Sequence, residues 1–129
     1  MMRLLLDTQA LMWWAGKSKR LSPKVRDLLE DSTNEVFISV ANAWEMQIKA
    51  HIGKLTLHKP WPEIVRDQMI TNGFQLLRVE LSHIEVLDSL PFHHKDPFDR
   101  LLIAQAIYEN LTLVSNDPKF SSYPVTLLW

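Results

Sequence analysis

The sequence predicts an α/β fold in which a mainly parallel sheet of four to five strands is covered by helices on both faces, giving three layers. Short apolar segments alternate along the chain with helical stretches of roughly ten residues. Neighbouring parallel strands need a crossover connection, which a helix usually provides, so this alternation favours a parallel sheet. The chain has 129 residues, of which 47% are hydrophobic, so it can fill one core, and we expect a single domain spanning residues 1–129.

The first strand is followed by two helices. Arg3–Leu6 is a short apolar run, typical of a buried strand, and residues 8–14 form a helical stretch that Gly16 ends. Ser22 before Pro23 places a capping hydroxyl ahead of a proline at the first helical position, which opens a helix ending near residue 31.

The second strand leads directly into a third helix. Glu35–Ser39 is predicted to be the strand, and residues 40–52 the helix, which Gly53 closes. The apolar side chains that recur at every fourth position of this helix are Val40, Trp44, Ile48 and Ile52.

The same order of helix and strand then repeats. A proline-flanked Trp61 opens a helix that Gly73 ends, and residues 74–79 are rich enough in β-formers to be a third strand. Ser82 and Glu85 have the spacing of a capping box, for a helix that ends near Leu90.

The last part of the chain completes the sheet. A polar loop at residues 92–95 precedes a strong helix at 98–110, residues 112–115 are a fourth strand, and residues 125–128 offer a fifth.

Composition excludes several classes of protein. The chain has no cysteine, so it has no thiolate metal site, disulfide or cysteine nucleophile, and its three glycines cannot build a dinucleotide-binding loop or a P-loop. No run reaches the ~18 apolar residues of a membrane span, and a charge interrupts the amino terminus too early for a signal peptide. We therefore expect a cytoplasmic protein with no membrane partner. The net charge of −1 gives no overall attraction to nucleic acid, so any such argument must be local.

Four carboxylates lie where the predicted topology brings polar residues together, because the crevice of an open α/β sheet lies beyond the carboxyl ends of its strands. Asp7 follows the first strand, Asp117 follows the fourth, and Glu45 lies about one and a half turns into the helix after the second. Asp99 begins a later helix, and it shares a face with the apolar residues Leu102, Ile103, Ala106 and Ile107.

Each carboxylate also has a local structural interpretation. Asp96, followed by proline and with a second carboxylate at the third helical position, is typical of a helix cap, and Asp117 invites the same explanation. Asp7 could cap the helix that follows it, and Glu45 could pair with Lys49 one turn later. Local pattern alone does not choose between these interpretations and a functional site.

The convergence of the four acids favours a metal site. The sequence places no obvious basic residue beside each of them, and such clustering is costly without a cation. Oxygen ligands without cysteine indicate a hard ion such as Mg²⁺ or Mn²⁺. His93 and His94 are adjacent rather than four residues apart, so we expect them on the loop surface or against phosphate rather than on a metal.

Several ordered motifs resemble the PIN-domain family, specifically the VapC-like toxins of bacterial type II toxin–antitoxin pairs, and the match runs over almost the whole chain. The matching motifs are Leu4-Leu5-Leu6-Asp7-Thr8, Ser39 with Trp44-Glu45, the block from His93 to Ala106, Val114-Ser115-Asn116-Asp117, and the terminal Leu128-Trp129. The asparagine in Ser115-Asn116-Asp117 is a mild departure from the commoner Thr-x-Asp.

The resemblance implies an α/β/α sandwich, an acidic site for Mg²⁺ or Mn²⁺, and endonucleolytic cleavage of RNA. The family's acidic positions fall on Asp7, Glu45, Asp99 and Asp117. We expect Asp7, Asp99 and Asp117 to ligate metal, and Glu45 to be a ligand or to orient the attacking water. Thr8 and Ser115 match supporting hydroxyl positions, and Asp96 is an extra acid of this branch.

The expected partners are RNA, a cognate antitoxin protein and a second copy of the chain in a homodimer. A basic rim that could receive RNA is offered by His93, His94, Lys95, Arg100 and Lys119. Trp13, Trp14 and Trp61 are candidate antitoxin contacts, since large aromatics favour interfaces, although tryptophans at helical spacing are more often core residues.

Two other functions compete with a metal-dependent ribonuclease. A phosphatase of the haloacid dehalogenase type also begins with a strand and an aspartate, but its second aspartate would fall where this chain has Gln9. A PIN-like module that binds RNA or protein without cutting it remains the alternative, and its weakness is that a dead site has no reason to hold uncompensated charge.

Overall fold

The computed structural model describes residues 1–129 and contains five strands: β1 (Arg3–Leu6), β2 (Glu35–Ser39), β3 (Gln75–Leu77), β4 (Thr112–Val114) and β5 (Leu127–Leu128). They form one sheet in the order β3-β2-β1-β4-β5, and every neighbouring pair is parallel. The predicted parallel α/β sheet is confirmed, with five strands. The third and fifth strands are shorter than predicted.

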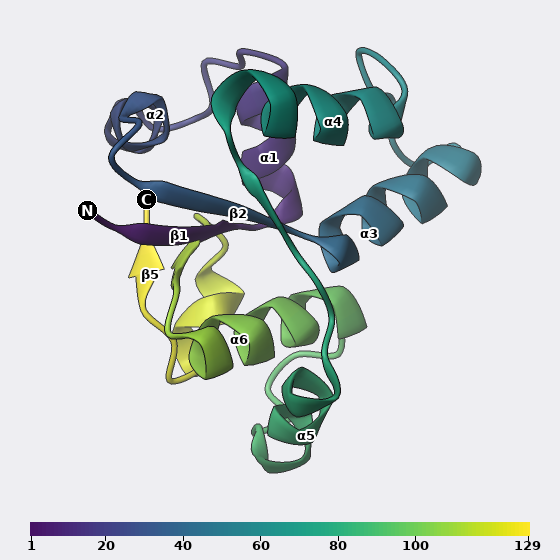
Figure 1. The fold of residues 1–129 in the computed structure, drawn as a ribbon. Helices are drawn as coiled ribbons and strands as arrows, with labels where there is room; N and C mark the ends of the chain where they lie inside the picture. The colour runs from purple at the N-terminus through teal and green to yellow at the C-terminus, as the bar shows by residue number, and fades with distance from the viewer.

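Helices cover both faces of this sheet (Figure 1). They are α1 (Thr8–Ala15), α2 (Pro23–Glu30), α3 (Val40–His51), α4 (Trp61–Asn72), α5 (Leu81–Ser89) and α6 (Pro97–Glu109), with a short 3₁₀ helix η1 (Pro118–Ser122). Figure 1 shows α1, α2 and α4 on one face, α5 and α6 on the other, and α3 projecting from the end of β2. None of the helices has the length and apolar character that crossing a membrane would require.

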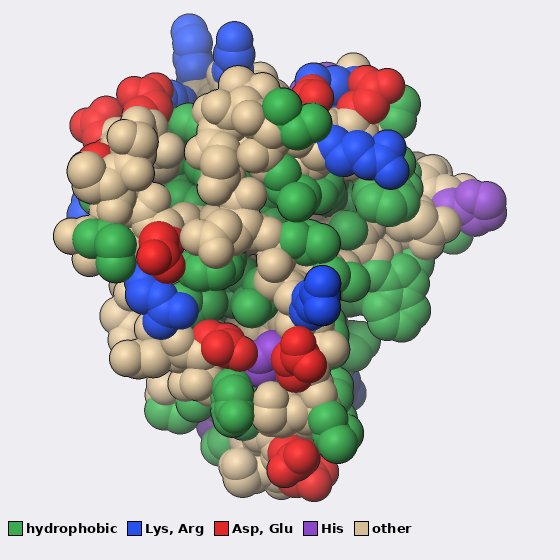
Figure 2. All heavy atoms as spheres, in the orientation of Figure 1, with side chains coloured by type: hydrophobic (Ala, Val, Ile, Leu, Met, Phe, Trp, Pro, Cys, Tyr) green, Lys and Arg blue, Asp and Glu red, His purple; other side chains and the backbone are tan.

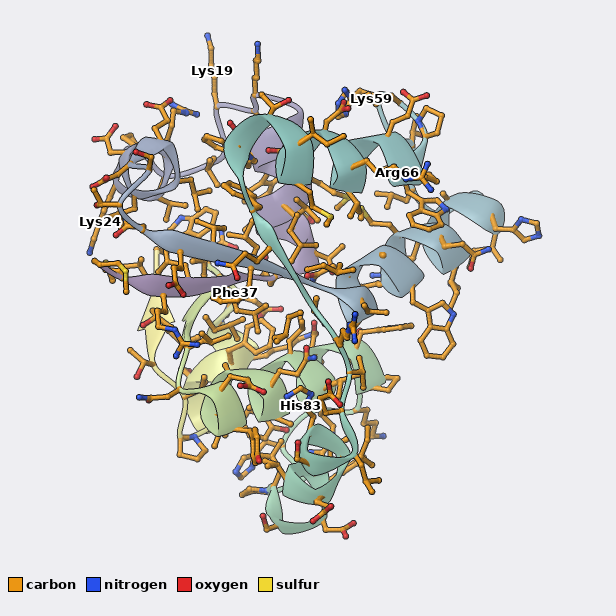
Figure 3. The ribbon with its side chains drawn as sticks, viewed as in Figure 1. Lys19, Lys24, Phe37, Lys59, Arg66 and His83 are labelled. Carbon is orange, nitrogen blue, oxygen red and sulfur yellow. The ribbon has the colours of Figure 1, made fainter.

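Alternation along the strands divides the core into two clusters. In β1, Leu4 and Leu6 pack with the layer that contains α1, α2 and α4, whereas Leu5 packs with α6. Phe37 of β2 also faces α6, as Figure 3 shows. All three leucines are fully buried, because successive side chains of a central strand point to opposite covered faces.

The apolar stripe of α3 is not the buried face of the helix. Val40, Trp44 and Ile52 are 39%, 59% and 55% exposed, and apolar side chains are visible on the surface over α3 (Figure 2). The buried residues of the helix are instead Ala41, Asn42, Glu45 and Met46. The helix therefore turns a partly polar face inward, toward the ends of the strands.

The predicted capping box of α5 is also wrong by two residues. Glu80, not Ser82, is the cap, and the backbone N–H of Glu80 donates to Nδ1 of His83 at 2.9 Å. His83 is fully buried, lies between α5 and α6 in Figure 3, and its Nε2 is 2.8 Å from Glu109 Oε2. The cap thus ties α5 to α6.

Candidate functional site

Two of the acids lie at the carboxyl ends of neighbouring strands. Asp7 follows β1, and its backbone N–H donates to the carbonyl of Val114, the last residue of β4. Asp117 lies three residues after Val114. Both acids are also helix caps, since Asp7 accepts from Ala10 N at 2.7 Å and Asp117 accepts from Lys119 N at 3.0 Å. Asp7 and Asp117 therefore cap helices, as their local interpretation predicted, and they also lie at the same end of the sheet, as the predicted convergence requires.

The other acids come from α3 and from the start of α6, which meet at the same end of the sheet (Figure 1). Glu45 is 4% exposed and lies on the inward face of α3. Asp99 has a side chain that is 19% exposed, and Asp96 caps α6 by accepting from Phe98 N and Asp99 N. The topology thus brings together acids that are nearly a hundred residues apart.

A cavity of about 800 Å³ opens between these elements. Its acidic lining consists of Asp7, Glu45, Asp96, Asp99 and Asp117, and its basic lining of Lys49, Lys54, His94 and Lys119. Thr8 lines it as well, and Ser115 is hydrogen-bonded to Asp7 from just outside. Every acid and hydroxyl residue predicted from the sequence is therefore at or beside this cavity, which we call the acidic cavity.

Burial and mutual repulsion perturb two of these carboxyls. Burial raises the pKa of Asp7 to about 6, against the opposing effect of hydrogen bonds from Ser115 and the Ala10 N–H, and the charges of Asp99 and Glu45 raise it further. Burial also raises the pKa of Asp99 to about 6, with added repulsion from Asp96 and Glu45, although the contact with His94 acts in the opposite direction. The cavity therefore holds negative charge at a cost that a cation would relieve.

Two basic side chains already offset part of this charge: the pairing of Lys49 with Glu45 confirms the local interpretation of the sequence, whereas the pairing of His94 with Asp99 was not predicted. Lys49 Nζ lies 2.5 Å from Glu45 Oε2, and His94 Nε2 lies 2.8 Å from Asp99 Oδ2. Partial burial acts to lower the pKa of Lys49, but the hydrogen bond and charge of Glu45, with the charges of Asp96 and Asp99, outweigh it and raise the pKa. His94 is thus a partner of a site carboxylate rather than a free loop residue.

The donor set fits a hard divalent cation in its chemistry. It offers carboxylate and hydroxyl oxygens and no thiolate, and carboxylates with raised pKa values gain most from a positive charge. The side chains do not close around a point, since no group of three or more His, Cys, Asp or Glu side chains is arranged to hold an ion. Mg²⁺ usually keeps several water molecules, so one or two direct carboxylate ligands are sufficient for it.

The predicted basic rim is only partly correct. Lys119 and His94 line the acidic cavity, whereas Lys95 is exposed outside its lining and His93 packs edge-on against Tyr123 at a ring distance of 5.2 Å. The cavity also contains Lys49 and Lys54, which sequence reasoning missed as rim residues. For Lys49, the sequence did contain a signal, because this residue lies one turn after Glu45.

The prediction that Arg100 belongs to the basic rim is wrong, because this residue is only 9% exposed and is not free to bind RNA. Its guanidinium donates to the Pro91 carbonyl at 2.8 Å, approaches the Leu90 carbonyl and the Tyr123 hydroxyl, and lies 4.5 Å from the Phe92 ring centroid. It therefore anchors the loop before α6, which carries His94 and Asp96 into the acidic cavity.

Replacing Arg100 with Met should lower the free energy of unfolding by about 2–3 kcal/mol, because carbonyl acceptors in the loop lose a charged donor. Urea unfolding of the purified variant measures this loss. Lys95→Met, which removes an exposed cation from the same loop, is the control and should change stability by less than about 0.5 kcal/mol. Equal stability of the two variants would contradict an anchoring role for Arg100.

The three tryptophans proposed as interface residues are partly buried. Trp13 packs edge-on against Trp129, Trp14 stacks on Phe74, and Trp61 packs against the first core cluster. Trp13 and Trp14 also line a second cavity of about 680 Å³, between α1, α2 and α4. Trp44 of α3, by contrast, is 59% exposed and packs edge-on against the Phe98 ring.

Comparison with known proteins identifies relatives over nearly the full chain. The model of the PIN domain family matches residues 4–125. Ribonuclease VapC22 of Mycobacterium tuberculosis is 27% identical over 98% of this chain and 99% of its own length. Ribonuclease VapC16 of the same organism is 33% identical, over 46% of this chain and 43% of its own length.

Solved structures share the fold at low sequence identity. A crystal structure of VapBC2 from Rickettsia felis bound to a DNA fragment from its promoter superposes with a TM-score of 0.71, at 20% identity and 99% coverage of both chains. The DNA-bound VapBC from Salmonella typhimurium superposes with a TM-score of 0.66, at 16% identity, 99% coverage of this chain and 98% of the other.

Proposed function

The chain belongs to the PIN domain family, and we propose that it is an endoribonuclease that hydrolyses RNA phosphodiester bonds with a divalent metal ion, Mg²⁺ or Mn²⁺. The observation that carries the proposal is the acidic cavity, in which five carboxylates converge and two of them, Asp7 and Asp99, have pKa values raised to about 6. The relatives named as ribonucleases support the same reaction.

Asp7, Asp99 and Asp117 are the residues that would hold the metal, directly or through its water molecules, with Asp96 adding negative charge at the rim. A divalent ion bound there would supply the positive charge that activates water and stabilises the phosphate oxygens. The protein contributes orientation: Ser115 and the start of α1 fix Asp7 by hydrogen bonds, and His94 fixes Asp99. Glu45, held between Thr8 and Lys49, would accept a hydrogen bond from the attacking water.

The basic residues of the acidic cavity would bind the RNA backbone. Lys54 and Lys119 have no carboxylate partner within salt-bridge distance, so their charge is available to phosphates. Binding through a few lysines is electrostatic and weakens with added salt. The site thus combines an acidic centre with a small basic rim.

We also propose that the chain is the toxin of a toxin–antitoxin pair and forms a homodimer. Structural neighbours are described as toxin–antitoxin complexes, which supports an antitoxin partner. The second cavity, beside Trp13 and Trp14, offers aromatic surface that an antitoxin segment would cover.

The proposed activity is tested by incubating the purified chain with total RNA in Mn²⁺ or in EDTA and mapping the new ends. We expect cleavage in Mn²⁺, none in EDTA, and none by Asp7→Asn, which controls for contaminating nuclease. Intact RNA in Mn²⁺ would contradict the proposal and favour a PIN-like module that binds without cutting. Equal cleavage in EDTA would contradict the use of a divalent metal ion.

A further inference from the structure

Asn42 is a fully buried polar residue that the sequence analysis did not single out. It lies on the inward face of α3, one turn before Glu45. Its Oδ1 accepts a hydrogen bond from the Ser39 backbone N–H at 2.8 Å, and its Nδ2 donates to Thr8 Oγ1 at 3.0 Å. Both halves of the amide are therefore used, between the start of α3 and the start of α1.

The first of these bonds determines which way the amide points. A backbone N–H can only donate, so the atom of Asn42 that faces Ser39 must be the oxygen. The NH₂ group must then face Thr8, and since it can only donate, the Thr8 oxygen accepts there. The orientation of Asn42 follows from the fixed backbone and needs no assumption about hydrogens.

The second bond determines where the single proton of the Thr8 hydroxyl goes. With its oxygen already accepting from Asn42, Thr8 donates its proton to Glu45 Oε1, at 2.6 Å. The other oxygen of Glu45 lies 2.5 Å from Lys49 Nζ. Both oxygens of a carboxylate that is 4% exposed are thereby held by donors, which fixes the orientation of Glu45 at the wall of the acidic cavity.

The hydrogen bonds that hold Asn42 continue to α6, the helix that carries Asp99. Ser39, whose N–H holds Asn42, donates its hydroxyl proton to Gln105 Oε1 of α6 at 2.6 Å, and Gln105 Nε2 donates to the Arg78 carbonyl at 3.2 Å. Ser39 and Gln105 are both fully buried. Buried polar groups joined in a fully satisfied network are rigid, so α1, α3 and α6 are held in one arrangement around the acidic cavity.

We propose that Asn42 is a positioning residue, which acts through the Thr8 hydroxyl to hold Glu45 in its working orientation. The inference rests on the proposed ribonuclease function for its effect on rate, while the hydrogen-bond chain itself can be observed without activity.

The decisive variant is Asn42→Asp, which is nearly isosteric. It keeps an acceptor for the Ser39 N–H but replaces the donor toward Thr8 with an acceptor, so the Thr8 proton turns to residue 42 and Glu45 loses one of its two donors. We expect kcat for RNA cleavage to fall roughly 10- to 100-fold with KM within about twofold. Thr8→Val should have an effect of similar size.

The chain offers a matched control in Asn34. Its Oδ1 accepts from the Met2 N–H and its Nδ2 donates to the Leu28 carbonyl, at the opposite end of the sheet from the acidic cavity. Asn34→Asp makes the same chemical change there, so it should lower the thermal midpoint without changing kcat. A structural role alone would make the two Asp variants behave alike.

The route through Thr8 is tested by a double-mutant cycle with Thr8→Val. If Asn42 acts through Thr8, the double variant is no slower than the slower single variant. Should Asn42→Asp fail to fold, Asn42→Ala enters the same cycle, since it removes the donor without burying a charge. Additive losses in kcat, or a kcat within twofold of wild type for a folded Asn42 variant, would overturn the proposal.

A readout independent of activity separates this proposal from the proposed function. The Thr8 hydroxyl proton should be visible by NMR in metal-free wild type as a slowly exchanging signal coupled to the Glu45 carboxylate, and it should be lost in the Asn42 variant but kept in Asn34→Asp. Absence of that signal in wild type overturns the positioning proposal. Absence of cleavage by wild type while the signal is present overturns the ribonuclease function instead.

Discussion

Asp99→Asn should reduce metal-dependent RNA cleavage roughly 100-fold or more, because it removes a carboxylate that faces the acidic cavity. Asp99 lies at the start of α6 on a helix whose Leu102, Ile103 and Ala106 are buried against the sheet, so its side chain points toward the strand ends. The variant should remain folded in EDTA and unfold at a slightly higher temperature than wild type, since one repelling charge leaves the cavity.

Asp96→Asn is the matched comparison, since it changes a neighbouring acid by the same atom. Asp96 caps α6 through one oxygen, which accepts from Phe98 N and Asp99 N, and asparagine caps a helix equally well. We expect less than a tenfold loss of cleavage and little change in thermal midpoint. Both variants are measured with Mn²⁺ and with EDTA. An active Asp99 variant beside an inactive Asp96 variant would reverse the roles of the two acids.

Asp7→Asn should stabilise the metal-free protein at pH 7.5 by about 3 kcal/mol and should flatten its dependence on pH. The folded-state pKa of Asp7 is raised from 3.8 to about 6, chiefly by burial. The folded chain therefore holds this proton more tightly than the unfolded chain does. Its stability is highest below the unfolded pKa, falls as pH rises from about 4 to about 6, and stays lowered above that window.

Urea unfolding in EDTA between pH 4.5 and 7.5 measures this difference for wild type and Asp7→Asn. Comparing wild type with Asp7→Asn cancels the titration of the other groups. Asp88→Asn, which removes an exposed carboxylate on α5, controls for the change in net charge. The gap between wild type and Asp7→Asn should widen as pH rises and should close when Mn²⁺ is added to wild type. A gap that is independent of pH would mean that Asp7 is not held at a raised pKa.

The fold could be predicted because its signals are local. The run Leu4-Leu5-Leu6 is fully apolar because β1 is central and covered on both faces, and caps such as Ser22 and Asp96 accept from their own helices. The face of α3 could not be predicted in the same way. A period of four residues identifies an apolar stripe but not which side of the helix is buried. Here the inward side carries Asn42 and Glu45, and their hydrogen bonds with Thr8 offset the cost of burying these polar side chains.

The acids of the site could also be predicted, since the carboxyl ends of parallel strands meet at one edge. What surrounds them depends on contacts between distant parts of the chain. Arg100 is buried because the carbonyls of Leu90 and Pro91 and the Tyr123 hydroxyl surround it, and no pattern near residue 100 reveals them. The pairing of His94 with Asp99 likewise depends on how that loop is anchored.

The central claim is that the acidic cavity binds a divalent ion used to cut RNA, and anomalous diffraction from crystals soaked in Mn²⁺ tests it most directly. We predict an anomalous peak beside Asp7 and Asp99 in wild type, and its loss or marked weakening in Asp99→Asn crystals of the same form. No peak in the acidic cavity at millimolar Mn²⁺, from protein that still cleaves RNA in EDTA, would contradict the claim.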